Sequence, residues 1–178
     1  MAEIKQNPHL ISKRAMENMS STRGSQQLLV SEIFLKINNA KDKPKKIEIL
    51  KQYNTAAIKQ LLKGCFDPNI EWDLPEGTPP FIENEAPEGT EHSILMNEYK
   101  RLWRFVKGAD TSTNKLQKET MFIQMLEGLS SQEAKVLIDV KNKCLNKTYK
   151  GLTADMVKEA FGWNEQFITP TVIETAGI

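Results

Sequence analysis

Lysine is the residue of this sequence with the clearest capacity for chemistry, and that chemistry is anion binding. Residues 41–63 hold seven lysines and two acidic residues, which gives a local charge of +5. The sequence has two further basic tracts, one without any acidic residue inside it, namely Lys141, Lys143, Lys147 and Lys150, and the other Lys100, Arg101, Arg104 and Lys107. Clustered cations of this kind neutralise phosphates. The phosphate contacts expected from these tracts are Lys45, Lys46, Lys63, Lys147 and Lys150.

A turn after Lys150 adds backbone donors to this pattern. Gly151, Leu152 and Thr153 open a predicted helix that ends at Phe161. The first N–H groups of a helix have no partner inside the helix, and the helix dipole favours an anion beside them. We therefore expect Gly151 and Thr153 to take part in phosphate binding. The sequence leaves open the alternative that the lysines are only the solvated faces of amphipathic helices.

Catalysis and metal binding have no candidate residues in this sequence. His9 and His92 are isolated and lack a serine, cysteine or carboxylate partner. No glycine begins the GxxxxGK[ST] pattern of a phosphate-binding loop. Cys65 and Cys144 lie 79 positions apart without a CxxC pair, which excludes a zinc site of standard spacing. We expect a protein that is not an enzyme, with no cofactor and no metal, whose cysteines are buried thiols in a reducing compartment.

The helices that must position the lysines follow from the hydrophobic spacing, which predicts an all-α fold, an irregular helical bundle with more than half of its residues in helices. The expected helices cover residues 25–37, 45–52, 55–66, 93–107, 114–129, a segment after a capping box at 130–133, and a last segment up to 161. Breaks are expected near 40–44, 67–91 and 146–152. Pro44 fits the first turn of the second helix, and Asn54 is the expected cap of the third.

The segment between residues 67 and 91 has a different composition, with five prolines, two glycines, eight acidic residues and no lysine or arginine. It predicts a long acidic, Pro-rich central loop, called the acidic loop below. Its Trp72 and Phe81 are either core anchors or contacts for a protein partner. Leaving a large apolar side chain in water costs about 1.5 to 3 kcal/mol. We therefore expect at least two of Trp72, Leu74, Phe81 and Ile82 to pack on the helices.

Length and composition indicate one soluble domain. The chain has 178 residues, of which 39% are apolar and 26% charged, with a net charge of +1. We expect a flexible N-terminal arm (1–24), a helical domain (25–162) and a C-terminal tail (163–178). No eighteen apolar residues follow one another and no signal-like apolar run opens the chain, so we expect an intracellular protein without a membrane partner.

Two helical segments resemble the N-terminal helical DNA-binding domain of ATP-dependent DNA ligases. The first runs from a basic start at Lys45 through Asn54-Thr55 to Phe66-Asp67-Pro68, and the second from Ala134 through Gly151-Leu152 to Ala160-Phe161. The resemblance covers about residues 25–162 and implies sequence-independent binding of double-stranded DNA through helix-end loops. A ligase-type Lys-x-Asp-Gly element is missing, because Lys107-Gly108-Ala109-Asp110 does not supply it.

The stretch Leu74-Pro75-Glu76-Gly77-Thr78-Pro79-Pro80 resembles small proteins of large tailed phages of the marine myovirus type. That resemblance implies a location in the cytoplasm of an infected bacterium or in the virion. The function expected from both resemblances is that of a phage-encoded DNA-binding accessory protein. The alternative is a protein-interaction module or virion component, which would meet phage or host proteins through the acidic loop and the two termini.

Overall fold

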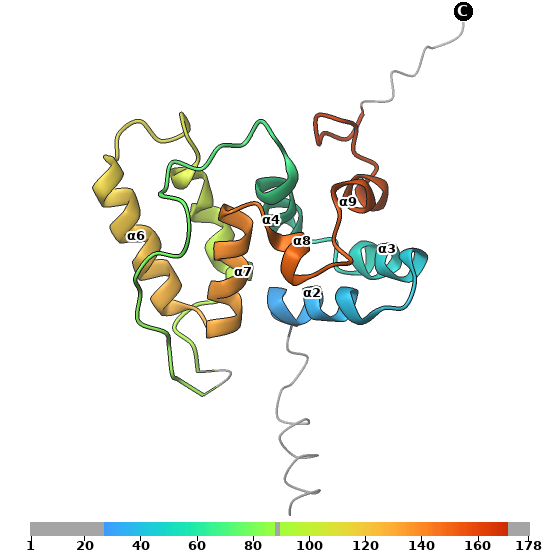
Figure 1. The fold of residues 1–178 in the computed structure, drawn as a ribbon, viewed down its shortest axis with the longest axis horizontal. Helices are drawn as coiled ribbons and strands as arrows, with labels where there is room; N and C mark the ends of the chain where they lie inside the picture. The colour runs from blue at the N-terminus through green and yellow to red at the C-terminus, as the bar shows by residue number, and fades with distance from the viewer. Residues whose placement is uncertain (1–26, 88–89, 171–178) are drawn as a thin grey trace, which may run out of the picture.

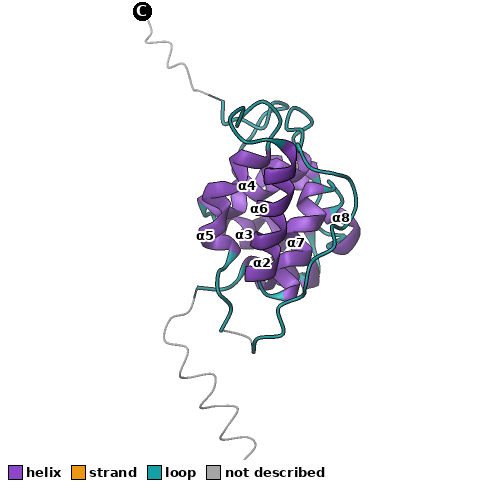
Figure 2. Cartoon of the chain, turned by 90° about the vertical axis from the view of Figure 1, so that its left-hand side faces the viewer, coloured by secondary structure: helices purple, strands orange, loops and turns teal. Residues whose placement is uncertain are grey.

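The computed structural model describes residues 27–87 and 90–170, and this part of the chain is all-α, as the hydrophobic spacing predicts (Figure 1). Helices hold 56% of the described residues, and no strand is present among them. Figure 2 shows the helices packed into one body with loops around it. The predicted arm (1–24) and residues 171–178 of the predicted tail lie outside the described residues.

The helices, in chain order, are α2 (Val30–Asn39), α3 (Lys43–Gln52), α4 (Ala56–Phe66), α5 (Leu95–Glu98), the 3-10 helix η1 (Tyr99–Phe105), α6 (Lys115–Gly128), α7 (Ser131–Lys141), α8 (Leu145–Thr148) and α9 (Ala154–Phe161). No helix of the described ranges has the length and apolar character needed to cross a bilayer.

Local side chains set most helix starts. Pro44 lies in the first turn of α3, as predicted, and Asp42 caps that helix by accepting from the Lys45 N–H at 3.1 Å. The expected cap of α4 is wrong by one residue, because Thr55 and not Asn54 accepts the N–H of Ile58 at 3.2 Å. Ordinary hydroxyl and carboxylate caps therefore define these ends.

Three predicted segments differ from the structure. The first helix begins at Val30 and not near residue 25. The helix expected over 93–107 is a short α5 followed by η1, which places Phe105 in the core and leaves Trp103 45% exposed. The two aromatic side chains therefore do not share a core face. The break expected near 146–152 is interrupted by α8, which covers Leu145–Thr148.

Helix α7 is the centre of the core. Figure 1 shows it between α6 on one side and α2, α4 and α8 on the other, and it packs against all four. Eight of its eleven residues are buried, including the charged Glu133, Asp139 and Lys141. A helix buried on nearly all sides must satisfy its polar groups inside the protein. These three side chains accordingly bind backbone or side-chain groups of neighbouring segments.

The acidic loop lies along the outside of α6 and α7 (Figure 1). Trp72, Leu74 and Phe81 pack against the core, which confirms the expectation that at least two of the four apolar side chains do so. Ile82 is the exception, because it is 80% exposed.

Lysines of the helical part hold the acidic loop in place. The Lys118 ammonium, 3% exposed on α6, donates to the Asp73 carboxylate at 2.9 Å and to the Asp110 carbonyl at 2.8 Å. On the surface, Lys107 pairs with Glu71 at 2.9 Å. Hydrogen bonding from Lys118 lowers the pKa of Asp73, and hydrogen bonding from Lys107 lowers that of Glu71. Part of the negative charge of the acidic loop is thus neutralised within the molecule.

Trp72 fastens the start of the acidic loop to α4. Its indole N–H donates to the carbonyl oxygen of Gly64 at 3.0 Å, and its ring lies over the Cα of that glycine. A Cβ at position 64 would lie 2.8 Å from the Trp72 Cζ2 atom. Glycine at this helical position therefore provides the space that the indole occupies. The structure favours the core-anchor interpretation of Trp72.

Glu133, at the start of α7, joins three helices. The predicted capping box forms only in part, because Ser130 accepts the N–H of Glu133 at 3.3 Å while the Glu133 carboxylate is used elsewhere. Its two oxygens accept the N–H of Val30 at 3.0 Å and that of Leu95 at 2.8 Å. These are the first residues of α2 and α5. One fully buried carboxylate therefore caps two helices that lie 65 positions apart in the chain.

We predict that Glu133→Gln destabilises the protein by about 1 to 3 kcal/mol, the cost of a buried polar group left without a partner. An amide offers one acceptor oxygen, so its NH2 group would face the N–H of either Val30 or Leu95. Urea denaturation at pH 7 measures the change. Glu85→Gln, at an exposed position of the acidic loop, is the control and should leave the midpoint unchanged. Equal midpoints for the two variants would contradict this role of Glu133.

The same carboxyl should make stability depend on pH. Burial raises the pKa of Glu133 above its ordinary value of 4.5, against the two N–H bonds that lower it. Between pH 4.5 and the raised pKa, the folded state binds more protons than the unfolded state, so the free energy of unfolding falls as pH rises. The free energy of unfolding of wild type should therefore exceed that of Glu133→Gln by more near pH 4.5 than at pH 7. A constant difference across this range would show that the carboxyl titrates alike in both states.

We predict that Gly64→Ala costs about 1 to 3 kcal/mol of unfolding free energy, because the added methyl group meets a rigid ring that cannot move without breaking its own hydrogen bond. Calorimetry or urea denaturation gives the value. In the Trp72→Ala background the same substitution should cost far less, since the obstructing ring is gone. A Gly64→Ala cost that is unchanged by removal of the ring would contradict the packing argument.

Candidate nucleic-acid interface

The structure brings the lysines of α3 to the turn between α8 and α9. Helix α3 packs on α9, and the Lys46 side chain lies directly against Gly151. A Cβ on Gly151 would collide with the Lys46 ammonium and with its Cδ and Cε atoms. Residues 105 positions apart in the sequence thus lie together, and the early lysines meet the basic turn at this pair.

Buried side chains fix the turn from α8 to α9. Leu145 and Leu152 are fully buried, and the Tyr149 ring packs edge-on to Phe34 of α2, with centroids 5.7 Å apart. The Thr148 hydroxyl donates to the Asp139 carboxylate of α7 at 2.6 Å. The backbone of the turn is therefore attached to α2 and α7.

Two lysines of this turn project from the fixed backbone. Lys147 and Lys150 are exposed, as is Lys45 on α3, while Lys46 is partly buried. Within residues 27–87 and 90–170, none of these four ammonium groups forms an ion pair. We call Lys45, Lys46, Lys147, Lys150 and Gly151 the lysine surface.

Backbone donors lie beside these ammonium groups. Thr153 caps α9 by accepting the N–H of Met156 at 3.4 Å, so its hydroxyl oxygen is used inside the helix start. In the described part of the chain, the N–H groups of Lys150 and Gly151 have no acceptor. Thr153 shapes the turn, and the two N–H groups and the Lys46 ammonium are the donors available to an anion.

Two acidic residues of α9, near the lysine surface, form ion pairs with other lysines. Glu159 of α9 pairs with Lys43 at 2.6 Å, and Asp155 pairs with Lys158 at 3.5 Å. Both sides of the Lys43 pair are 56% exposed, so it contributes little to stability. The pairing still offsets the acidic charge of α9 that would otherwise face the lysine surface.

One predicted phosphate contact, Lys63, and two lysines of the second basic tract are placed differently. Lys63 is partly buried on α4, a helix that carries no member of the lysine surface. Lys141 and Lys143 of the second basic tract donate to the carbonyl oxygens of Pro75 at 2.7 Å and Asp67 at 2.6 Å. These two lysines hold the acidic loop.

The third basic tract lies elsewhere on the molecule. It follows η1, which packs on α6, toward the end of the molecule opposite α3 and α9 in Figure 1. The third tract is therefore carried by a different part of the fold from the lysine surface.

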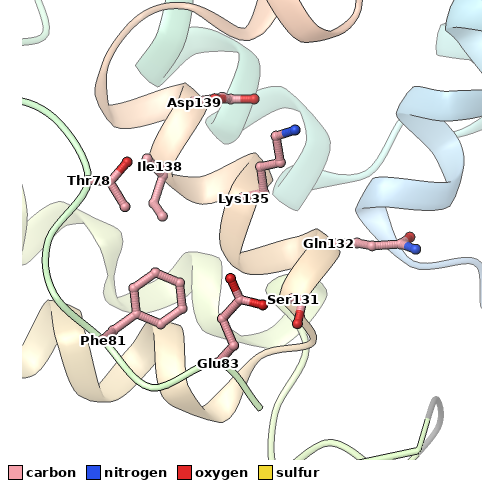
Figure 3. A pocket seen from close by; sticks show the side chains of 8 residues that line it. All are labelled: Thr78, Phe81, Glu83, Ser131, Gln132, Lys135, Ile138 and Asp139. Carbon is pink, nitrogen blue, oxygen red and sulfur yellow. The ribbon is translucent and has the colours of Figure 1, made fainter. Parts of the chain in front are cut away.

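A groove lies between the acidic loop and α7, with a volume of about 450 Å³. Figure 3 shows the Phe81 ring on the loop side, Ile138 on the α7 side, and Glu83 beside Ser131 at one end. Thr78, Gln132, Lys135 and Asp139 complete the lining. No group of three or more potential metal ligands occurs in residues 27–87 and 90–170.

The cysteines are not activated thiols. Burial raises the pKa of Cys65 to about 11 and also raises that of Cys144, whose thiol lies 3.6 Å from the Asp139 carboxylate. A thiolate is the reactive form, so both groups are poor nucleophiles at neutral pH.

Sequence reasoning misses the roles of two residues that organise the fold, Glu133 and Gly64. The capping box predicts that Glu133 caps its own helix, and Gly64 stands alone in the sequence without a motif. The only local indication that Glu133 has a structural role is its place in the first turn of an otherwise apolar helix. The indication at Gly64 is clearer, because a glycine on the apolar face of a helix suggests that a large side chain packs over it.

Comparison with known proteins identifies a family but no function. The model of a family of unknown function (DUF6433) matches residues 33–147, about two thirds of the chain, so the chain belongs to this family. The matched range includes Lys45, Lys46 and Lys147 and ends before Lys150 and Gly151. No curated protein and no solved structure matches the chain.

We predict that Gly151→Ala moves the Lys46 ammonium and changes the free energy of unfolding by no more than about 0.5 kcal/mol, the usual range for a surface substitution. The atoms displaced are the end of a flexible side chain, unlike the rigid ring at Gly64. NMR of the lysine Cε–Hε groups should show the shift of Lys46, and urea denaturation the small change in stability. A destabilisation as large as that of Gly64→Ala would mean that Lys46 is held rigidly.

Proposed function

We propose that this member of the DUF6433 family is a phage-encoded, non-enzymatic accessory protein that binds the phosphate backbone of double-stranded DNA through its lysine surface. The observation that carries the proposal is the contact of Lys46 with Gly151, which joins the lysines of α3 to those of the α8–α9 turn. Four ammonium groups and two unpaired backbone N–H groups then belong to the same region.

The chemistry of this surface suits a series of phosphate groups better than a single carboxylate in one fixed position. Ammonium groups on long side chains act as point charges and adapt to several phosphate positions. Contacts of this kind carry no sequence information, so the binding should be sequence-independent. Each neutralised phosphate contributes about 0.9 to the salt slope on duplex DNA.

The resemblances to ligase DNA-binding domains and to small phage proteins support the kind of DNA contact and the location that we propose. A turn at the start of a helix is the element with which ligase DNA-binding domains are expected to grip duplex DNA, and the α8–α9 turn is such an element. The setting proposed is the cytoplasm of an infected bacterium or the virion.

A second candidate function is docking of a phage or host protein, and the groove beside α7 favours it. Phe81 lines this groove, and Ile82 next to it is 80% exposed. The charge of the acidic loop supports this function less, because Glu71 and Asp73 are paired with Lys107 and Lys118 inside the molecule.

We predict that Lys147→Glu with Lys150→Glu weakens binding to unrelated duplex sequences by the same large factor, because the two ammonium groups bind phosphates, which every sequence presents alike. The salt dependence should become shallower by about two units of slope, one for each ammonium group replaced. Fluorescence anisotropy with labelled duplexes over a range of salt concentrations measures both effects.

The control is Lys115→Glu with Lys135→Glu, two exposed lysines away from the lysine surface. Each double variant lowers the net charge by four, from +1 to −3, so bulk charge is matched. Equal weakening by both variants would show that only net charge matters. Absence of wild-type binding to duplex and single-stranded DNA at low salt would refute the proposal and leave protein docking as the function to test.

A further inference from the structure

The 3-10 helix η1 places its side chains in three rows. A 3-10 helix has three residues per turn, so residues i and i+3 lie above one another. Tyr99, Leu102 and Phe105 form the inward row, in which Leu102 is 2% and Phe105 0% exposed. The second row holds Lys100 and Trp103, and the third holds Arg101 and Arg104, with Lys107 just beyond the helix.

Trp103 is left in solvent by this arrangement. It is 45% exposed, although burying such a ring is worth several times the contribution of a smaller side chain. The Arg104 guanidinium lies 5.6 Å from the Trp103 ring centroid. Lys100 is placed similarly, 6.0 Å from the Tyr99 ring. The exposed Trp103 ring is therefore accompanied by the Arg104 guanidinium.

The ion pairs of this segment are weak ones. Arg101 pairs with Glu98 at 3.0 Å, and Lys107 with Glu71 at 2.9 Å, with both cations more than half exposed. Exposed pairs of this kind exchange easily for another anion. In the described part of the chain, Lys100 and Arg104 pair with no carboxylate. An exposed indole with Arg104 beside it and further cations along the same short helix thus favours a ligand that is both anionic and aromatic.

From this combination we infer that Lys100, Trp103 and Arg104 form a second binding surface, for single-stranded nucleic acid, on which an unpaired base stacks on the Trp103 ring while the cations contact phosphates. Bases of a duplex are already stacked on one another, so only a single strand presents a base in this way. Base–aromatic stacking tolerates any base and is worth about 1 to 3 kcal/mol per base.

This surface is distinct from the lysine surface. It lies on η1 beside α6, whereas the lysine surface lies on α3 and the α8–α9 turn (Figure 1). The lysine surface has no aromatic residue among its members and responds only to charge. An acidic peptide would satisfy the cations of η1 but would leave the face of the indole without a partner, which makes it the less complete match.

The experiment uses the full chain carrying Lys147→Glu and Lys150→Glu, so that binding at the lysine surface is reduced. Three probes of about twelve units are compared, within the usual site size of single-strand binders. They are oligothymidylate, an abasic oligonucleotide with the same phosphates, and polyglutamate. The expected result is that oligothymidylate binds about 5- to 150-fold more tightly than the abasic strand, which is the stacking energy converted to affinity.

Substitution of Trp103 decides whether the stacking is the cause. Trp103→Ala should abolish the preference for oligothymidylate over the abasic strand, and Trp103→Phe should keep part of it. Leu116→Ala, which removes another large exposed apolar side chain, should keep all of it. Quenching of tryptophan fluorescence by oligothymidylate should disappear in Trp103→Phe. Oligouridylate is tested in parallel to show whether RNA or DNA binds more tightly. Tighter binding of either oligothymidylate or oligouridylate than of the abasic strand supports the inference.

The inference is overturned if the abasic strand or polyglutamate binds as tightly as oligothymidylate, because η1 would then be a general polyanion or acidic-peptide surface. It is also overturned if Trp103→Ala leaves the base preference intact. These outcomes are independent of duplex binding by the wild-type lysine surface, so either proposal can fail without the other.

Discussion

The arrangement of this fold depends on one buried carboxylate. Glu133 accepts the first N–H groups of α2 and α5, which places both helices against the start of α7. Burial of a charge is costly, and the two N–H donors together with the positive ends of two helix dipoles offset that cost. The arrangement continues outward, because α2 packs on α3 and α3 packs on α9. The contact of Lys46 with Gly151 therefore rests on the position that Glu133 gives to α2.

The charges of the sequence are divided between internal and external roles. Lys118 and Lys141 are buried, and they donate to the Asp73 carboxylate and the Pro75 carbonyl of the acidic loop, respectively. Lys143 donates to the carbonyl oxygen of Asp67. A count of lysines along the chain cannot separate Lys141 and Lys143 from the exposed Lys147 and Lys150, since all four lie in the same basic tract. The distinction is one of tertiary contact, because an ammonium group that satisfies a loop carbonyl has fewer donors left for a ligand.

Periodicity and capping chemistry predict the all-α class and most helices, because these depend on short stretches of sequence. The cost of leaving apolar side chains in water predicts that at least two of Trp72, Leu74, Phe81 and Ile82 pack on the helices, but not that Ile82 is the exposed one. The 3-10 geometry of η1 is not predicted, since the spacing of Tyr99, Leu102 and Phe105 fits either helix type over so few residues. Contacts between distant segments are beyond the sequence for another reason. Nothing local to Glu133 or Gly64 indicates that its partner is Leu95 or Trp72.

The lysine surface combines a fixed backbone with flexible side chains, and this combination limits what it can recognise. The turn that carries Lys147 and Lys150 is attached through Leu145, Tyr149 and Leu152, so the charges begin from defined positions. The ammonium groups themselves can move by several bonds, and no ion pair among the described residues orients them. A ligand with a regular row of charges can bind such a surface in many alignments along its length. A ligand that must be held in a single orientation gains little binding free energy from it. The η1 surface differs in this respect, because a stacked ring has only two chain torsions to order and fixes the plane of whatever packs on it.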